Sequence, residues 1–221
     1  MNLSKCAEYF TPSSDRVHII GCGSVGSTIA ENIARCGVKN ITLWDFDYVE
    51  SHNISNQMFR ECDIGQLKCE ALKDILCDIN PECKDTVKIE QKGWQGKVLS
   101  GYVFLCPDSI EVRRNFCESA MSNVNIKAVF DIRTMLEGAQ HYAADWRDQK
   151  SKQDLLNTMQ FSHEEAAEST PVSACGVTLG VSPTVRAICS VAVANFINFQ
   201  RNKGLKKFVM FNVFDMTLDA F

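Results

Sequence analysis

The sequence lacks any apolar run long enough to cross a bilayer. Its longest one, AICSVAVANFI at 187–197, has eleven residues and is interrupted by Asn195, whereas a transmembrane helix needs about twenty. Residues 1–10 are mixed in polarity and do not resemble a signal peptide. We therefore expect no membrane insertion and a cytoplasmic location.

An excess of positive charge is also absent. The chain has 23 Lys+Arg against 27 Asp+Glu, a formal net charge of -4, so it lacks the clustered basic charge that a nucleic-acid partner requires. Its 221 residues, 45% hydrophobic and 23% charged, are typical of a globular protein with a substantial core.

Paired cysteines are missing as well. The 11 cysteines are scattered singly, with no C-x-x-C pair, which excludes a structural zinc site built from such pairs, so no zinc is expected. An odd number of cysteines in a chain of this kind suggests a reducing cytosol. Several of them lie among apolar neighbours, where a free cysteine behaves as a small buried hydrophobic residue.

Strand and helix patterns alternate up to about residue 142. The sequence predicts strands at 16–20, 40–47, 86–90, 102–106 and 126–132, and helices at 24–37, 64–80 and 107–121. Asp63 is expected to cap the second of these helices. Such alternation predicts an α/β fold with a doubly wound, Rossmann-like, mainly parallel sheet and helices on both faces. We expect one domain over residues 1–221.

The character of the sequence changes towards the C-terminus. Residues 145–174 are polar, charged and weakly periodic, so we expect a long crossover loop over 145–181. The last helix is predicted to follow, with Ser182 as its cap and Pro183 at its first position. A strand at 207–215 is expected to close the fold.

A glycine motif marks the first turn of this fold. Gly21, Gly23 and Gly26 form G-x-G-x-x-G between a strand and a helix, where backbone N–H groups can bind phosphates. The motif does not distinguish NAD from ATP or S-adenosylmethionine, and a glycine turn that binds nothing is the alternative. Asp45 ends the next strand, the usual place of an acid that binds ribose hydroxyls, and Asp47 is either a second such acid or a solvated loop residue.

Five segments resemble one family. They are GCGSVG (21–26), LWDFDYVESHNISNQMF (43–59), DIGQLKCEALKDILCDINP (63–81), LCPDSIEVRRN (105–115) and IRTMLEGAQ (132–140). Together they resemble the ThiF/MoeB/HesA family, relatives of ubiquitin-activating enzymes, well over residues 16–142 and more loosely beyond. The resemblance implies ATP-dependent adenylation of the C-terminal glycine of a small β-grasp protein, either ubiquitin-like or a sulfur carrier, by a homodimer.

The chemistry of adenylation explains the polar residues in these segments. A carboxylate must attack the α-phosphate of ATP, so the site needs cations and neutral donors aimed at the developing charge. The resemblance implies that Asn53 and Gln57 supply such donors near the phosphates and ribose, and that Lys68 supplies a cation. It also implies that Asp108 holds Mg²⁺, which neutralises phosphate oxygens. The alternatives are a solvated lysine at Lys68 and a helix N-cap at Asp108.

The chain departs from the family pattern in two ways. Asn56 stands where the family usually has a phosphate-facing arginine, and we hypothesise that Arg60 or an arginine of a second subunit replaces it. The N-terminal arm is short and lacks the Arg-Tyr segment of the family. Arg113 matches a family arginine that we expect to be structural.

Cys175 is the candidate nucleophile. In relatives of this family a cysteine at the end of the crossover accepts the activated carboxylate, and a thiolate on a mobile loop suits that role. The alternative is one more buried cysteine. Cys189 is expected in the core, and Cys22 is expected to be too hindered to react.

Two other functions share part of these features. An NAD(P)-dependent oxidoreductase would use the glycine loop and Asp45, but it would need neither Lys68 nor Asp108. A non-catalytic scaffold subunit of an activating enzyme would explain Asn56, although Lys68, Asp108 and Cys175 oppose it. The sequence leaves open whether the carrier serves sulfur chemistry or protein conjugation.

Overall fold

An eight-stranded sheet forms the centre of the protein. The computed structural model describes all residues except 162–164 and 166–179. The strand order is β3-β2-β1-β4-β5-β6-β7-β8. The strands are β1 (Val17–Ile20), β2 (Ile41–Trp44), β3 (Lys88–Glu90), β4 (Gly101–Leu105), β5 (Ile126–Thr134), β6 (Gly138–Asp145), β7 (Phe208–Asn212) and β8 (Thr217–Ala220). The strands from β3 to β5 pair in parallel, and the three that follow extend the sheet in antiparallel pairs. The predicted doubly wound, mainly parallel fold is confirmed.

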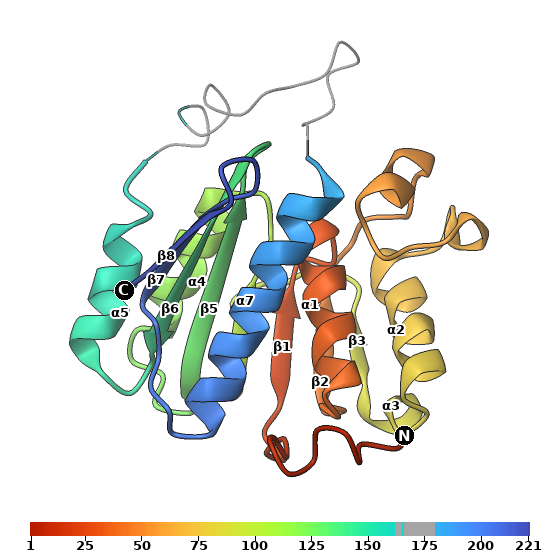
Figure 1. Cartoon of the computed structure of the whole chain (residues 1–221), viewed down its shortest axis with the longest axis horizontal. Coiled ribbons are helices and arrows are strands. Elements are labelled where there is room, and N and C mark those ends of the chain that lie inside the picture. The colour runs from red at the N-terminus through yellow and green to blue at the C-terminus, as the bar shows by residue number, and fades with distance from the viewer. Residues whose placement is uncertain (162–164, 166–179) are drawn as a thin grey trace.

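Helices cover both faces of this sheet (Figure 1). They are α1 (Ser24–Arg35), α2 (Lys68–Ile79), α3 (Cys83–Thr86), α4 (Ile110–Ala120), α5 (Gln149–Asn157) and α7 (Ser182–Gln200). The helices α1, α2 and α7 lie on one face, and α4 and α5 lie on the other. The central strands read as continuous apolar runs because both of their faces are buried. No helix among the described residues is long and apolar enough to cross a membrane.

Aromatic residues fasten α7 to the middle of the sheet. Phe196 packs edge-on against Tyr102 and Phe104 of β4 and Phe130 of β5, with ring centroids 5.2, 5.5 and 5.7 Å apart. All four side chains are buried. Edge-to-face contacts of this kind add to the free energy gained from apolar burial. They fix the axis of α7, and therefore the position at which it begins.

The crossover loop expected over 145–181 does not begin at residue 145. The strand β6 reaches Asp145, and the helix α5 follows, capped by Asp148, whose side chain accepts the N–H groups of Lys150 and Ser151. Between them, Trp146 is fully buried and donates its indole N–H to the Ala120 carbonyl at 2.9 Å. The prediction was wrong here because α5 is short and mostly polar, so its apolar periodicity is weak.

Three other boundaries differ from the prediction. Asp63 ends the 3-10 helix Glu61–Asp63 and accepts the N–H of Arg60 at 2.7 Å, while α2 begins only at Lys68. Ser182 is the first residue of α7 and Val181 its N-cap. The expected last strand is a hairpin, because Met216 takes a positive φ and the chain turns back as β8. Asp63 was misassigned because the sequence does not distinguish an acid that caps a following α-helix from one that hydrogen-bonds within a short 3-10 helix.

Two buried histidines link the sheet to its surroundings. His141 donates from Nδ1 to the Asp131 carbonyl at 3.4 Å and accepts the Asn195 side-chain amide at Nε2, 3.0 Å away. His18 accepts the Trp44 indole N–H at Nδ1 and donates from Nε2 to the Ser100 carbonyl, each at 3.2 Å. Because amide and indole N–H groups only donate, each ring is neutral. Burial lowers the pKa of both histidines to about 4.

These pKa values predict acid sensitivity. Between pH 6.5 and about 4 these two histidines are protonated in the unfolded chain but neutral in the folded chain, so the free energy of unfolding falls as the pH falls. Each histidine accounts for at most roughly 3 kcal/mol. In urea titrations from pH 7.5 to 4.5, His141→Gln should flatten this dependence. The exposed His52 serves as control, and equal slopes for His141→Gln and His52→Gln would contradict the assignment.

Candidate nucleotide-binding site

The glycine loop joins the end of β1 to the start of α1. Any larger residue at Gly21, where φ is +90°, would place its Cβ 2.8 Å from the Cys106 backbone. At Gly26 the added Cβ would lie 1.8 Å from the Gly21 carbonyl oxygen. Both positions therefore require glycine for packing. A Cβ added at Gly23 would meet no atom within 4 Å, and Gly23 is the N-cap of α1, where it offers no side chain. No side chain therefore caps the first turn of α1, as an anion-binding helix end requires.

Asp45 holds this loop in shape. Its side chain accepts the Cys22 N–H at 2.5 Å through Oδ2 and the Asp47 N–H at 2.8 Å through Oδ1. Burial raises the pKa of Asp45, against the effect of these two hydrogen bonds. Asp45 therefore connects the glycine loop to the end of β2, which is more than the ribose contact that its position in the sequence indicated.

Asp47 and Lys68 form an ion pair beside the loop. Lys68 is the first residue of α2, and its N–H donates to the Asp47 carbonyl at 2.8 Å. Its Nζ lies 2.9 Å from Asp47 Oδ2, with 11% of the lysine side chain exposed and 52% of the aspartate. Neither residue is the freely solvated surface side chain that the sequence left as an alternative. The lysine is held in place, and the acid remains open to solvent on one side.

The polar segment after β2 is folded into the 3-10 helix Ser51–Ser55. The buried Asn53 side chain accepts the Glu50 N–H at 2.9 Å, so its oxygen serves the local fold and its amide nitrogen is the group left for other contacts. The segment is attached to α1, because Met58 donates its N–H to the Ser27 hydroxyl at 3.2 Å. Gln57 Oε1 is buried and has no hydrogen-bond partner among the described residues. Such orphaned atoms are rare and mark places where a ligand or water belongs.

Asp108 lies in the turn after β4 and is exposed. The N-cap of α4 is Ser109, whose hydroxyl accepts the Val112 N–H at 3.3 Å, so Asp108 does not cap that helix. The Asp108 carboxylate accepts only the adjacent Ser109 N–H, at 2.9 Å, among the described residues. It is a hard oxygen donor at the carboxyl edge of the sheet, which suits Mg²⁺ held mainly by phosphate oxygens and water. No cluster of three or more potential metal-ligating side chains occurs in the described part of the chain.

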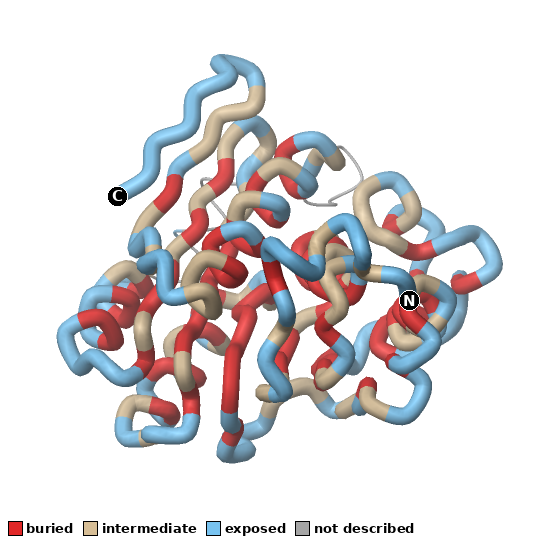
Figure 2. Tube along the Cα trace, turned by 60° about the horizontal axis from the view of Figure 1, so that its bottom comes forward, coloured by how far each residue is buried: buried red, intermediate tan, exposed pale blue. Residues whose placement is uncertain are grey.

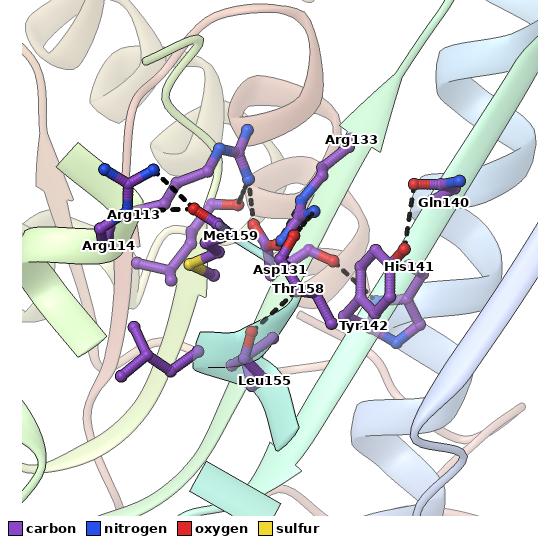
Figure 3. A network of polar contacts seen from close by, with 12 residues as sticks. Arg113, Arg114, Asp131, Arg133, Gln140, His141, Tyr142, Leu155, Thr158 and Met159 are labelled. Atoms are coloured by element: carbon purple, nitrogen blue, oxygen red, sulfur yellow. Dashed lines mark hydrogen bonds and ion pairs between the residues drawn. The ribbon is translucent and has the colours of Figure 1, made fainter. Parts of the chain in front are cut away.

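Arg113 belongs to a buried network that supports this turn (Figure 3). Its guanidinium donates to the carbonyls of Leu105, at 3.0 Å, and Pro107, and it pairs with the fully buried Asp131. The expected structural role of Arg113 agrees with these contacts. Asp131 was not singled out from the sequence, although an acid inside the apolar strand AVFDI is a signal for a buried ion pair.

The same network reaches the end of α5. Asp131 also pairs with Arg133 at 2.7 Å, and Arg133 donates to the Thr158 carbonyl at 2.9 Å and to its hydroxyl at 2.8 Å. Arg114 donates to the carbonyls of Met159, at 3.0 Å, and Phe161, at 2.5 Å. These contacts hold residues 158–161 against β5 and α4 (Figure 3).

Arg60 is not available to replace the missing arginine. Its guanidinium lies 3.0 Å from Asp63 and 3.1 Å from Asp78. The hydrogen bond to Asp63 is the main cause of a raised Arg60 pKa. Two carboxylates therefore already neutralise this cation.

The described cysteines near the site are protected thiols. Burial raises the pKa of Cys106 to about 12 and raises the pKa of Cys22 and Cys189 well above the usual value. Every cysteine that the structure describes is unpaired. Cys22 and Cys189 thus fit the expected non-nucleophilic roles. Cys175 lies outside the described residues.

Comparisons with known proteins point to one family. The ThiF family model matches residues 11–220. Ubiquitin-like modifier-activating enzyme 5 of Arabidopsis thaliana is 41% identical over 66 residues, which are 30% of this chain and 15% of that protein. The Caenorhabditis elegans protein of the same name is 36% identical over 75 residues, 34% of this chain and 18% of that one.

Solved structures share the fold at low identity. PaaA superposes with a TM-score of 0.69 at 15% identity, covering 94% of this chain and 64% of that one. Escherichia coli MccB with ATP superposes with a TM-score of 0.67 at 18% identity, again covering 94% and 64%. The chain thus spans less than two thirds of each of these relatives. With its family model matched along nearly its whole length, the chain belongs to the ThiF family.

Proposed function

We propose that residues 1–221 form one adenylation domain that uses Mg²⁺-ATP to activate the C-terminal carboxylate of a small β-grasp protein. The observation that carries this proposal is the position of Lys68, nearly buried at the start of α2 and held by Asp47 beside the glycine loop. A nucleotide phosphate is the anion for which such a lysine is needed. An NAD(P)-dependent oxidoreductase would have no use for it, and a scaffold subunit would have no reason to keep it in place.

The placement of the side chains supports the following reaction. The open N-terminus of α1 binds phosphate, and Asp47 keeps one side free for ribose hydroxyls. A carboxylate oxygen of the partner attacks the α-phosphorus, the bond from that phosphorus to the bridging oxygen breaks, and pyrophosphate leaves with that electron pair. Lys68 and the amide groups of Asn53 and Gln57 stabilise the added negative charge. Mg²⁺, held by Asp108 and phosphate oxygens, would neutralise charge on the nucleotide.

A second step would use Cys175. Its thiolate would attack the acyl carbon of the adenylate, forming a thioester and releasing AMP with the electron pair of the broken C–O bond. This part of the proposal depends on the resemblance and on the protected state of the described buried cysteines. Homodimerisation is likewise proposed from the resemblance.

The C-terminal hairpin offers a surface for the partner. The strands β7 and β8 project from the body of the protein with exposed side chains along β8 (Figure 2). Exposed apolar residues gather there: Met210, Phe214, Met216, Leu218 and Phe221. A free sheet edge with apolar side chains is suited to a β-rich protein partner. We assign this surface to the β-grasp protein.

The central experiment is ATP–pyrophosphate exchange with a candidate β-grasp protein, sought among the neighbouring coding sequences. Exchange should require the intact C-terminal glycine of that partner. Cys175→Ala should keep the exchange but lose a reducible covalent adduct between the two proteins. Oxidation or reduction of a nicotinamide cofactor without any exchange would overturn the proposal in favour of an oxidoreductase.

Lys68 is expected to be essential for exchange. Lys68→Ala removes a positioned cation next to the reacting phosphate and should lower kcat/KM for exchange by about 100-fold or more. The matched control is Lys73→Ala on the same helix, whose half-buried side chain lies one and a half turns further along α2. Both variants are compared with the wild type for exchange and for melting temperature. Equal losses in the two variants would remove Lys68 from the site.

The two aspartates should separate into different roles. Asp45→Asn can accept only one of the two N–H groups now bonded, so it should destabilise the fold by about 1–3 kcal/mol and impair nucleotide binding as well. Asp47→Asn loses a half-exposed ion pair and should change stability by less than about 1 kcal/mol. It should still raise the KM for ATP. Urea denaturation and ATP titrations of both variants test this, and a stable Asp45→Asn protein would be the contrary result.

A further inference from the structure

The proposed nucleotide site is short of positive charge. Three acids lie around it, Asp45, Asp47 and Asp108, and Lys68 is already paired with one of them. A bound triphosphate adds further negative charge, and the charge on its two outer phosphates grows as pyrophosphate leaves. The site therefore needs another cation, close to the outer phosphates.

Arginines elsewhere at this edge of the sheet are occupied. Arg60, Arg113 and Arg133 each pair with carboxylates. Arg186 differs from them, because it is exposed and has no carboxylate partner within the described ranges. Its described hydrogen bond runs from Nε to the Ser182 hydroxyl at 2.9 Å. Its charge is thus not neutralised, and a bond to a serine hydroxyl is easily exchanged for a stronger one to phosphate.

The packing of α7 on α1 brings Arg186 towards the glycine loop. Cys189 lies 3.6 Å from the carbonyl of Val25, the second residue of α1. Arg186 precedes Cys189 by three residues, so it lies about 4–5 Å nearer the start of α7. The first turns of α7 consequently extend past the N-terminus of α1 (Figure 1). Helical side chains lean towards the N-terminus, and the bond to Ser182 shows that Arg186 does so.

The residues just before α7 border the polar segment of the site. A Cβ at Gly180 would lie 3.3 Å from Asn56 Nδ2, so this part of the backbone lies against Asn56. The next residue is Gln57, whose buried oxygen has no partner among the described residues. Ser182, the anchor of Arg186, follows Gly180 by two positions. The anchor of Arg186 thus lies two positions from a residue that packs against Asn56, where the site lacks a cation.

The N-terminal arm cannot supply this charge within the same chain. Leu3 packs against Gly37, where a Cβ would lie 2.7 Å from the leucine side chain. Gly37 follows the C-terminal end of α1, and the glycine loop precedes its N-terminal end, at the opposite end of the strands (Figure 1). Within one chain, the described N-terminal arm is therefore not the source of this cation.

We propose that Arg186 binds the outer phosphates of ATP and stabilises the departing pyrophosphate. This inference rests on the proposed function and adds a residue to the same site. A planar guanidinium can contact two phosphate oxygens at once, which a lysine cannot do. The contact strengthens as charge accumulates on the leaving group, so Arg186 should contribute to both nucleotide binding and the rate of adenylation.

Nucleotide titrations by calorimetry, without the partner protein, test the assignment. Arg186→Gln should weaken ATP binding by about 10-fold or more, because a charge-assisted hydrogen bond is lost. The affinity for AMP, which lacks the outer phosphates, should stay within about 2-fold on the same reasoning. Arg186→Lys should recover part of the ATP affinity. The control is Arg201→Gln at the far end of α7, where the arginine lies 3.8 Å from the ring centroid of Tyr9.

The outcomes separate the two proposals. Unchanged ATP affinity in Arg186→Gln, or equal weakening of ATP and AMP binding, would overturn the role of Arg186 while leaving the proposed function standing. A wild-type chain that binds NADH but not Mg²⁺-ATP would overturn the proposed function itself. Selective loss of ATP affinity, restored in part by lysine and absent in Arg201→Gln, would support the assignment.

Discussion

The site depends on one buried carboxylate. Asp45 accepts N–H groups from the glycine loop and from the segment after β2, and so it connects two parts of the chain that lie 23 residues apart in the sequence. With this link in place, Asp47 lies where it can pair with Lys68. Lys68 then lies close enough to act electrostatically on Asp45 and on Cys22 of the glycine loop. The proposed phosphate site thus begins with hydrogen bonds that would touch no phosphate.

The fold was largely readable from the sequence because its central strands are buried on both faces. Continuous apolar runs separated by glycine and proline signals predicted β1, β2, β4 and β5 within a few residues. The failures have a common physical cause. The helix α5 and the C-terminal hairpin are held by tertiary contacts, such as the buried Trp146, rather than by a strong periodic pattern. Local patterns alone do not report such contacts.

The candidate site residues also divide into those that a local sequence pattern indicates and those that depend on tertiary contacts. The glycines, Asp45 and Asp47 were singled out because they stand at or just after strand ends, and Lys68 because of the family resemblance; their roles stay predictions. Asp131 and Arg186 were not singled out, since the ion pairs of the first and the lack of a described carboxylate partner for the second depend on what other elements place around them. The availability of a charge depends on its partners, as the pairing of Arg60 with Asp63 and Asp78 shows. No pattern in the sequence reveals which arginine is paired.

Firm attachment on either side of residues 162–179 has an evolutionary consequence. Arg114 and Arg133 hold the backbone carbonyls at 158–161, and Gly180 lies against Asn56. These hydrogen bonds are accepted by main-chain carbonyls, which every residue type carries. Substitutions at 158–161 therefore leave the acceptors in place, and the side chains there can diverge among descendants of this chain without loss of the anchoring contacts.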